Sequence, residues 1–277
     1  MKKLALSVFF AAAFAAPPTA FGQAAAPAAA PTPEHSFTGN LTLGSDYRFR
    51  GISQTYKLPT VQGGFDYAHS SGVYLGTWMS NVSGNQYANG AGLEWDMYGG
   101  YKGNFTDDLG YDVGMLYYYY PGAHYPNPPK NTKYDNLELY GALTYKWFVL
   151  KYSHTLSDFF GTNNDTFGGA CAGGDCFALT PGNSKGSGYL DLTYTYEVAD
   201  KLNLIAHVGH QSVRHYGKLD YTDYKLGVTK EINGFTFGAA IIGTNAKKAW
   251  YTVTELGGAG NKVVSKDTLV FTVGKTF

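Results

Sequence analysis

The chain has 277 residues, of which 16% are aromatic and 15% charged, and 21 basic residues balance 21 acidic ones. Because the basic residues form no cluster, nucleic acid is not an expected partner. No apolar run long enough for a membrane-spanning helix follows the N-terminal segment, which excludes a helical membrane protein.

The N-terminus has the features of a secretory signal peptide. Two lysines precede an apolar run that extends from Leu4 to Ala16, and small residues follow near Ala24. We therefore expect residues 1–24 to be removed on export, and a retained N-terminal anchor is the alternative. Residues 25–36 form a Pro/Ala-rich linker with too few large apolar groups to fold.

The segment 41–50 alternates apolar and polar side chains with a period of two, as a β-strand with two different faces does. The predicted apolar face consists of Leu41, Leu43, Tyr47 and Phe49. The opposite face carries Thr42, Asp46, Arg48 and Arg50. Either a protein core or lipid could cover the apolar face, and this pattern is compatible with both.

Eleven further segments of similar character follow, and we predict a strand in each. They begin near Val61, Val73, Leu93, Leu109, Asn136, Phe148, Tyr189, Leu202, Thr222, Phe235 and Asp267. Long and short connections alternate between them, whereas a Greek-key sandwich would mix the lengths irregularly. Outer-membrane barrels have short turns at one end and long loops at the other. The sequence therefore predicts a transmembrane, antiparallel, up-and-down β-barrel of about twelve strands, spanning residues 37–277.

Aromatic residues gather near the predicted strand ends, where the girdles of membrane barrels meet the lipid interface. This group comprises Phe105, Tyr117 to Tyr120, Trp147, Phe159 and Phe160. The last strand ends at Phe277, and Leu269, Phe271 and Val273 share one of its faces. This ending resembles the signal read by the outer-membrane barrel assembly machinery, although Lys275 interrupts the apolar row.

One long motif near the N-terminus resembles a known family. The run SDYRFRGISQT occupies residues 45–55, and PTVQGGFDYAHSSGVYLGTWMSNV follows from Pro59. It is similar to the N-terminal half of the TorF-type family, a group of conserved outer-membrane proteins of unknown function that are named as porins. The resemblance covers residues 41–105. It implies an outer-membrane barrel with a channel role, and it brings no catalytic residue and no cofactor.

Charged residues on the faces opposite the apolar ones are the candidates for lining the lumen. They are Asp46, Arg48, Arg50, Asp66, Glu94, Asp96, Lys102, Glu138, Asp191, Glu197, Asp223 and Lys225. The acidic excess among them predicts a mild preference for cations. We expect neighbouring opposite charges such as Asp46 and Arg48 to pair, because an unpaired buried charge is costly. Arg48 and Arg50 would lie near the outer rim and could instead attract anionic solutes.

The connections 121–134 and 157–187 are long enough to fold inward, and both are candidate constrictions of the lumen. The second connection contains Cys171 and Cys176 in the motif CAGGDC, which favours a small disulfide loop in an exported chain. A metal site is the alternative, but two thiolates without a nearby histidine do not complete a tetrahedron.

Two further functions compete with the channel. A lipid-modifying enzyme would need a serine and a histidine within hydrogen-bond reach, but the adjacent Ser153 and His154 point to opposite faces of a strand. His207 and His210 also fall on opposite faces, which favours surface or interface histidines over a metal site. A non-conducting structural or adhesive barrel is the other alternative. We expect no catalytic residue, metal or cofactor, and we expect lipids and small solutes as partners.

Overall fold

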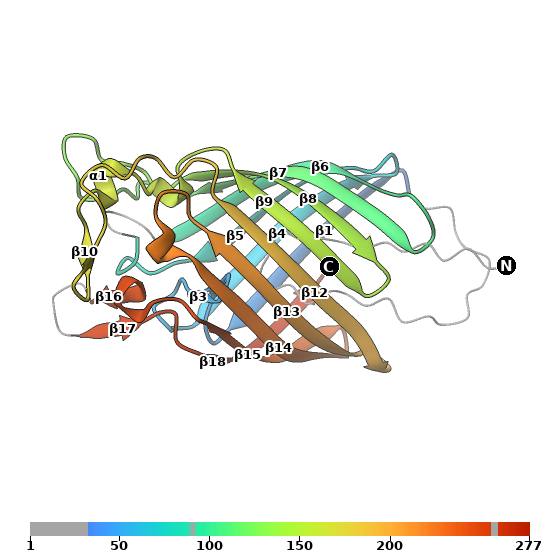
Figure 1. The fold of residues 1–277 in the computed structure, drawn as a ribbon. Helices are drawn as coiled ribbons and strands as arrows, with labels where there is room; N and C mark the ends of the chain where they lie inside the picture. The colour runs from blue at the N-terminus through green and yellow to red at the C-terminus, as the bar shows by residue number, and fades with distance from the viewer. Residues whose placement is uncertain (1–32, 88, 90–91, 256–259) are drawn as a thin grey trace.

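The computed structural model describes residues 33–277 except 88, 90–91 and 256–259. The predicted signal peptide and most of the predicted linker lie outside the described residues. Twelve antiparallel strands close into a barrel, which confirms the predicted fold class (Figure 1). The helices among the described residues are too short or too polar to cross a membrane.

The barrel strands pair with their neighbours in chain order, and the last strand closes the circle by pairing with the first. They are β1 (His35–Gly44), β4 (Thr60–His69), β5 (Val73–Asn81), β6 (Leu93–Asn104), β7 (Leu109–Tyr119), β8 (Asn136–Tyr145), β9 (Phe148–Thr155), β12 (Gly188–Ala199), β13 (Leu202–Ser212), β14 (Tyr221–Ile232), β15 (Phe235–Thr244) and β18 (Thr268–Thr276).

Smaller elements lie in the connections between these strands. Three two-stranded sheets are formed by β2 (Arg48–Phe49) with β3 (Ile52–Ser53), β10 (Cys171–Ala172) with β11 (Asp175–Cys176), and β16 (Thr252–Thr254) with β17 (Asn261–Val263). The short helices are η1 (Phe159–Gly161), α1 (Asn164–Phe167), η2 (Gly217–Leu219) and η3 (Lys248–Tyr251).

The connections differ strongly in length between the two ends of the barrel. Tight turns join β4 to β5, β6 to β7, β8 to β9, β12 to β13, and β14 to β15. The longer connections leave from the opposite end, where α1, β10, β16 and β17 gather (Figure 1). We call these the short-turn end and the long-loop end. The predicted alternation of short and long connections is confirmed.

The two faces of the barrel wall have opposite chemistry. In β8, Leu139 and Leu143 are each 47% exposed on the outside, whereas Glu138, the residue before Leu139, is 1% exposed and points inward. The same alternation in β14 exposes Leu226 and Val228 and buries Asp223. A protein that folds around an apolar core in water shows the reverse arrangement, with charges outside.

The first strand differs from the sequence prediction. β1 ends at Gly44 rather than at residue 50, and its pairing with β4 and β18 also ends there. Leu41 and Leu43 are exposed on the outer face as predicted. Tyr47 and Phe49 were predicted to share that face, but they are only 1% and 7% exposed because the chain turns into the barrel after Gly44.

The predicted aromatic girdle is right only in part. Phe105 and Trp147 are exposed at the short-turn end. Tyr118 and Tyr120 are buried inside the barrel, where Phe160 packs against both. Alternate residues of a strand point to opposite faces, so half of a continuous tyrosine run must point into the lumen.

Candidate functional site

Residues 45–59, which connect β1 to β4, fold into the lumen, and we call this segment the strap. Its tip is the β2–β3 hairpin, where Arg50 has a φ of 45° and Gly51 a φ of 80°. A Cβ atom on Gly51 would lie 2.4 Å from Cγ2 of Thr244 and 2.8 Å from Cβ of Asp223. Only glycine combines this backbone conformation with such close contact to β14 and β15.

The side chain of Arg50 connects the strap to strands on the far side of the barrel. Its Nη2 donates to Oε2 of Glu138 in β8 at 2.7 Å, and its Nη1 donates to Oε1 of Gln211 in β13 at 2.6 Å. The guanidinium carbon lies 4.2 Å from the ring centroid of Tyr189 in β12. These three strands stand on the far side of the barrel from β1, so the strap spans the lumen.

A second ion pair stabilises the base of the strap. Arg48 Nε donates to Oδ2 of Asp46 at 2.6 Å, which places the predicted pair in contact. The other carboxylate oxygen of Asp46 accepts hydrogen bonds from Ser53 at 2.6 Å and Thr55 at 2.9 Å. Arg48 also donates to the carbonyl of Lys266 at 3.0 Å. Both charged groups are fully partnered and buried, so they do not line water near the outer rim.

Glu94 links the strap to the aromatic side of the lumen. Its two carboxylate oxygens accept hydrogen bonds from Tyr47 at 2.7 Å and from Tyr120 at 2.8 Å. Tyr47 also packs edge-on against Trp78 at 5.4 Å between centroids. Asp96 lies in the same wall and is buried. These contacts pack the strap against this wall of the barrel.

The predicted constrictions 121–134 and 157–187 each contribute residues that pack with the strap inside the barrel. They supply Ala123, Tyr125, Tyr134 and Phe160 to the buried cluster that also contains Tyr47 and Phe49 of the strap. The segment that crosses the lumen is the strap, of which residues 45–50 were predicted to belong to a wall strand. Alternating aromatic and charged residues are compatible with either location, because both a wall strand and an inserted hairpin have two faces.

A row of alternating charges continues along the inner wall toward the short-turn end. Five residues on neighbouring strands are successive partners in the strand register. From β6 to β12 they are Lys102, Asp112, Ala142, Lys151 and Asp191. Adjacent strands lie about 4.8 Å apart, so each charge faces an opposite one within one or two strands. We call Lys102, Asp112, Lys151 and Asp191 the charged row. Because the partner strands are far apart in sequence, only the register reveals it.

His207 lies next to Asp191, the last residue of this row. Its Nε2 lies 3.1 Å from Oδ1 of Asp223, and its Nδ1 lies 3.9 Å from Oδ1 of Asp191. His207 therefore lies on the inner wall, with its side chain 14% exposed. His210 does lie on the opposite, exposed face. Lys225 is the register partner of His207. Among the described residues, no hydrogen bond or ion pair to the Lys225 side chain is found.

Two predicted lumen residues lie nearer the short-turn end. Asp66 in β4 accepts a hydrogen bond from the hydroxyl of Tyr98. Glu197 in β12 accepts one from the backbone N–H of Lys201 at 3.0 Å, which fastens the turn to β13. The structure thus separates these two carboxylates from the strap.

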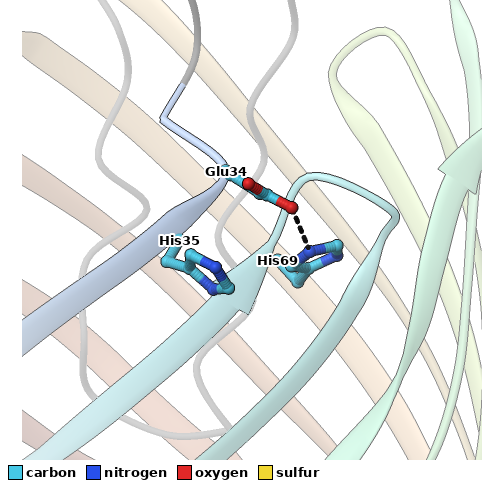
Figure 2. Close-up of side chains that lie close together, drawn as sticks. All are labelled: Glu34, His35 and His69. Atoms are coloured by element: carbon cyan, nitrogen blue, oxygen red, sulfur yellow. Dashed lines mark ion pairs between the residues drawn. The ribbon is translucent and has the colours of Figure 1, made fainter.

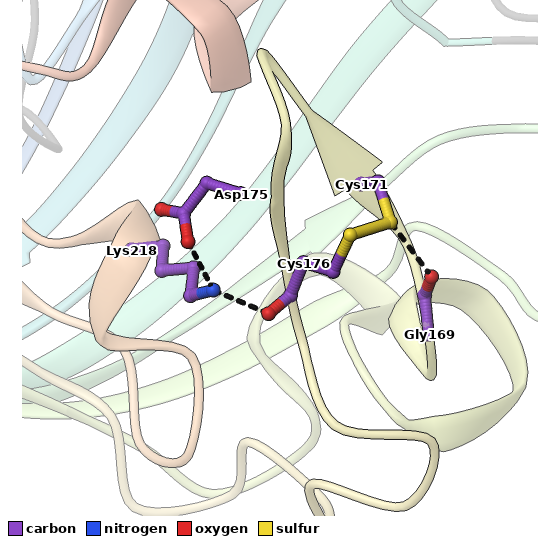
Figure 3. Close-up of a disulfide and its surroundings, with 5 residues drawn as sticks. All are labelled: Gly169, Cys171, Asp175, Cys176 and Lys218. Carbon is purple, nitrogen blue, oxygen red and sulfur yellow. Dashed lines mark hydrogen bonds and ion pairs between the residues drawn. A yellow bond between two sulfur atoms is a disulfide. The ribbon is translucent and has the colours of Figure 1, made fainter.

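The two cysteines are joined by a disulfide that closes the β10–β11 hairpin at the long-loop end (Figure 3). Lys218 from η2 donates to Oδ1 of Asp175 at 2.6 Å and also to the carbonyl of Cys176. The hydrogen bond from Lys218 lowers the pKa of Asp175. These contacts attach the hairpin to a neighbouring loop, so its role here is to order the loops.

Comparison with known proteins gives one family. The sequence model of a family described as "Bacterial protein of unknown function (Gcw_chp)" matches residues 28–277. No curated protein matches the sequence. The narrower TorF-type resemblance stays a prediction.

Several solved structures have a similar fold. The KdgM porin in complex with disordered oligogalacturonate has 6% identity and a TM-score of 0.49, over 87% of this chain and 98% of that one. The NanC porin has 8% identity and a TM-score of 0.49, over 87% and 99%. An outer membrane channel from Pseudomonas putida F1 has 11% identity and a TM-score of 0.45, over 89% and 97%. These low values assign neither a solute nor an activity.

Proposed function

The chain belongs to the Gcw_chp family of bacterial proteins of unknown function, and we propose that it is an outer-membrane, porin-like channel for ions or small polar solutes, with the strap as its constriction. The observation that carries this proposal is the inverted wall of the closed barrel, apolar outside and charged inside. A barrel has no open sheet edge, so its backbone groups remain paired when lipid surrounds it.

The inner wall supports a path for small polar solutes. The charged row lies on β6, β7, β9 and β12, and the strands across the barrel have small, uncharged inward residues. These include Gly238 and Ala240 in β15 and Thr272 and Gly274 in β18. Solutes would pass between the small-residue wall and the charged row, where acidic groups favour cations. Lipids surround the barrel in this proposal, and Phe277 remains the expected contact for the assembly machinery.

Reconstitution of the full chain in a planar lipid bilayer under a salt gradient tests the channel. We expect discrete conductance steps and a reversal potential of cation sign. Bilayers that receive detergent alone, or protein denatured by heat, are the controls. A reversal potential of anion sign would contradict the predicted selectivity, and the absence of steps from well-folded protein would contradict the open channel.

One observation favours a second function, a barrel that does not conduct at rest. Arg50 and Glu138 are 3% and 1% exposed, so water does not reach this ion pair in the lumen. A barrel sealed by the strap would be silent as the wild type but would conduct once the strap is displaced. A purely structural barrel would stay silent in both states. The conductance of the wild type and of a strap variant therefore distinguishes an open channel, a barrel closed by the strap and a purely structural barrel.

A further inference from the structure

Three potential metal ligands meet at the short-turn end, outside the lumen. They are Glu34, His35 at the start of β1 and His69 at the end of β4 (Figure 2). One ligand atom from each lies within 4.8 Å of the others. His35 and His69 are direct partners in the register of β1 and β4, and their ring centroids are 5.2 Å apart. Two rigid strands therefore place the imidazoles side by side.

The surroundings orient all three groups. His35 Nδ1 lies 3.0 Å from the hydroxyl of Tyr67, and His69 Nδ1 lies 2.7 Å from the hydroxyl of Ser71. The Nε2 atom of His69 points at Glu34, 3.5 Å from its Oε1. The backbone carbonyl of Glu34 accepts a hydrogen bond from the N–H of Ser70 at 2.9 Å. Hydrogen bonds to the second ring nitrogen are a recurrent feature of metal-binding histidines.

We propose that Glu34, His35 and His69 bind a divalent transition-metal ion such as Zn²⁺. Two imidazoles and one carboxylate form a ligand set that Zn²⁺ accepts, and water can occupy the fourth position. Binding through Nε2 places the ring proton of His69 on Nδ1, where Ser71 Oγ can accept it in place of the contact from the Ser71 N–H. This site is independent of the proposed channel function.

Binding requires only a small contraction of the cluster. Metal bonds of about 2.0 to 2.1 Å at tetrahedral angles put ligand atoms roughly 3.4 Å apart. The Glu34 side chain is 71% exposed, so its carboxylate has room to move toward the ion. The bound ion would join the segment that enters β1 to the β4–β5 turn. It would therefore fix the N-terminal segment at the rim of the barrel.

The test uses the full mature chain in detergent without a polyhistidine tag, because such a tag binds the same ions. Calorimetric titration with ZnCl₂ should show one saturable site, and Co²⁺ should give the visible absorption of a site with nitrogen and oxygen ligands. His35→Ala and His69→Gln should each weaken Zn²⁺ binding by at least about tenfold. His210→Ala is the matched control, since this exposed histidine also lies on a strand but outside the cluster.

Two results would overturn the proposal. One is a wild-type protein that shows no saturable Zn²⁺ binding. The other is a double variant, His35→Ala with His69→Gln, that binds Zn²⁺ within twofold of wild type while remaining folded by gel mobility with and without heating. Neither result bears on conductance, so failure here leaves the channel proposal to its own experiment.

Discussion

Arg50 and Glu138 meet inside the barrel with Nη2 and Oε2 2.7 Å apart, although 88 residues separate them in the chain. The arginine stands at the tip of the strap and the glutamate in the wall at β8. This contact, with the one from Arg50 to Gln211, ties the connection after the first strand to the far side of the lumen. In the proposed channel, this contact holds the strap in place across the lumen.

Glu138→Ala should reduce the free energy of unfolding by about 3 to 5 kcal/mol, because it leaves the buried Arg50 without a counter-charge. Urea titration of the protein in lipid vesicles, followed by tryptophan fluorescence, measures this loss. The control is Lys130→Ala, which removes an ion pair to Asp165 of the same 2.7 Å length on the surface. That change should cost about 0 to 1 kcal/mol. Equal losses in the two variants would contradict the structural role of Arg50.

Gly51→Ala should displace the strap and increase conductance, because the added methyl group would collide with Thr244 and Asp223. Planar-bilayer recording measures the change against wild type. Gly122→Ala is the control, since Gly122 also has a positive φ, of 77°, but nothing lies within 4 Å of an added Cβ atom. The two variants share the backbone strain and differ in the clash. If both variants have the same conductance, the position of the strap does not control conduction.

Leu226→Arg should destabilise the barrel by about 2 to 4 kcal/mol in vesicles, because Leu226 is exposed at mid-height of β14 and would face the centre of the bilayer. Ile232→Arg, on the same face at the end of the same strand, should cost about 0 to 1 kcal/mol. Urea titration of both variants gives the comparison. A barrel surrounded by water would show no such dependence on depth.

Lys225→Gln should shift the reversal potential further toward cation selectivity, because it removes a positive charge from the inner wall near Asp223 and His207. The measurement is the zero-current potential in a salt gradient. Lys185→Gln, in the connection between β9 and β12, removes the same charge from a loop and should leave the potential nearly unchanged. A shift of equal size in both variants would assign selectivity to the net charge rather than to the lumen.

The wall strands follow directly from the sequence. In β8 and β12, leucines alternate with polar residues such as Glu138 and Asp191. A period of two places the two kinds of residue on opposite faces only in a β-strand. Tight turns such as Asn233–Gly234 mark where one strand ends and the next begins. Local chemistry therefore determines the strands, their faces and the alternation of connection lengths.

The charged row was not predictable in the same way. Lys102, Asp112, Lys151 and Asp191 lie on four different strands, and their order around the wall depends on how neighbouring strands are staggered. A shift of one residue in any pair would move a side chain to the other face. Register is fixed by the closed barrel as a whole, so it is a property of the tertiary structure.

The sequence alone determined that residues 46–50 alternate between charged and aromatic side chains, and only the tertiary structure decided that they cross the lumen. On the outside, Tyr47 and Phe49 would meet lipid and leave Arg50 in the pore. Inside, Tyr47 reaches Glu94 and the Nη atoms of Arg50 reach Glu138 and Gln211, so the charge of the strap tip is neutralised by a buried carboxylate. These partners come from strands far away in the chain, and no local pattern contains them.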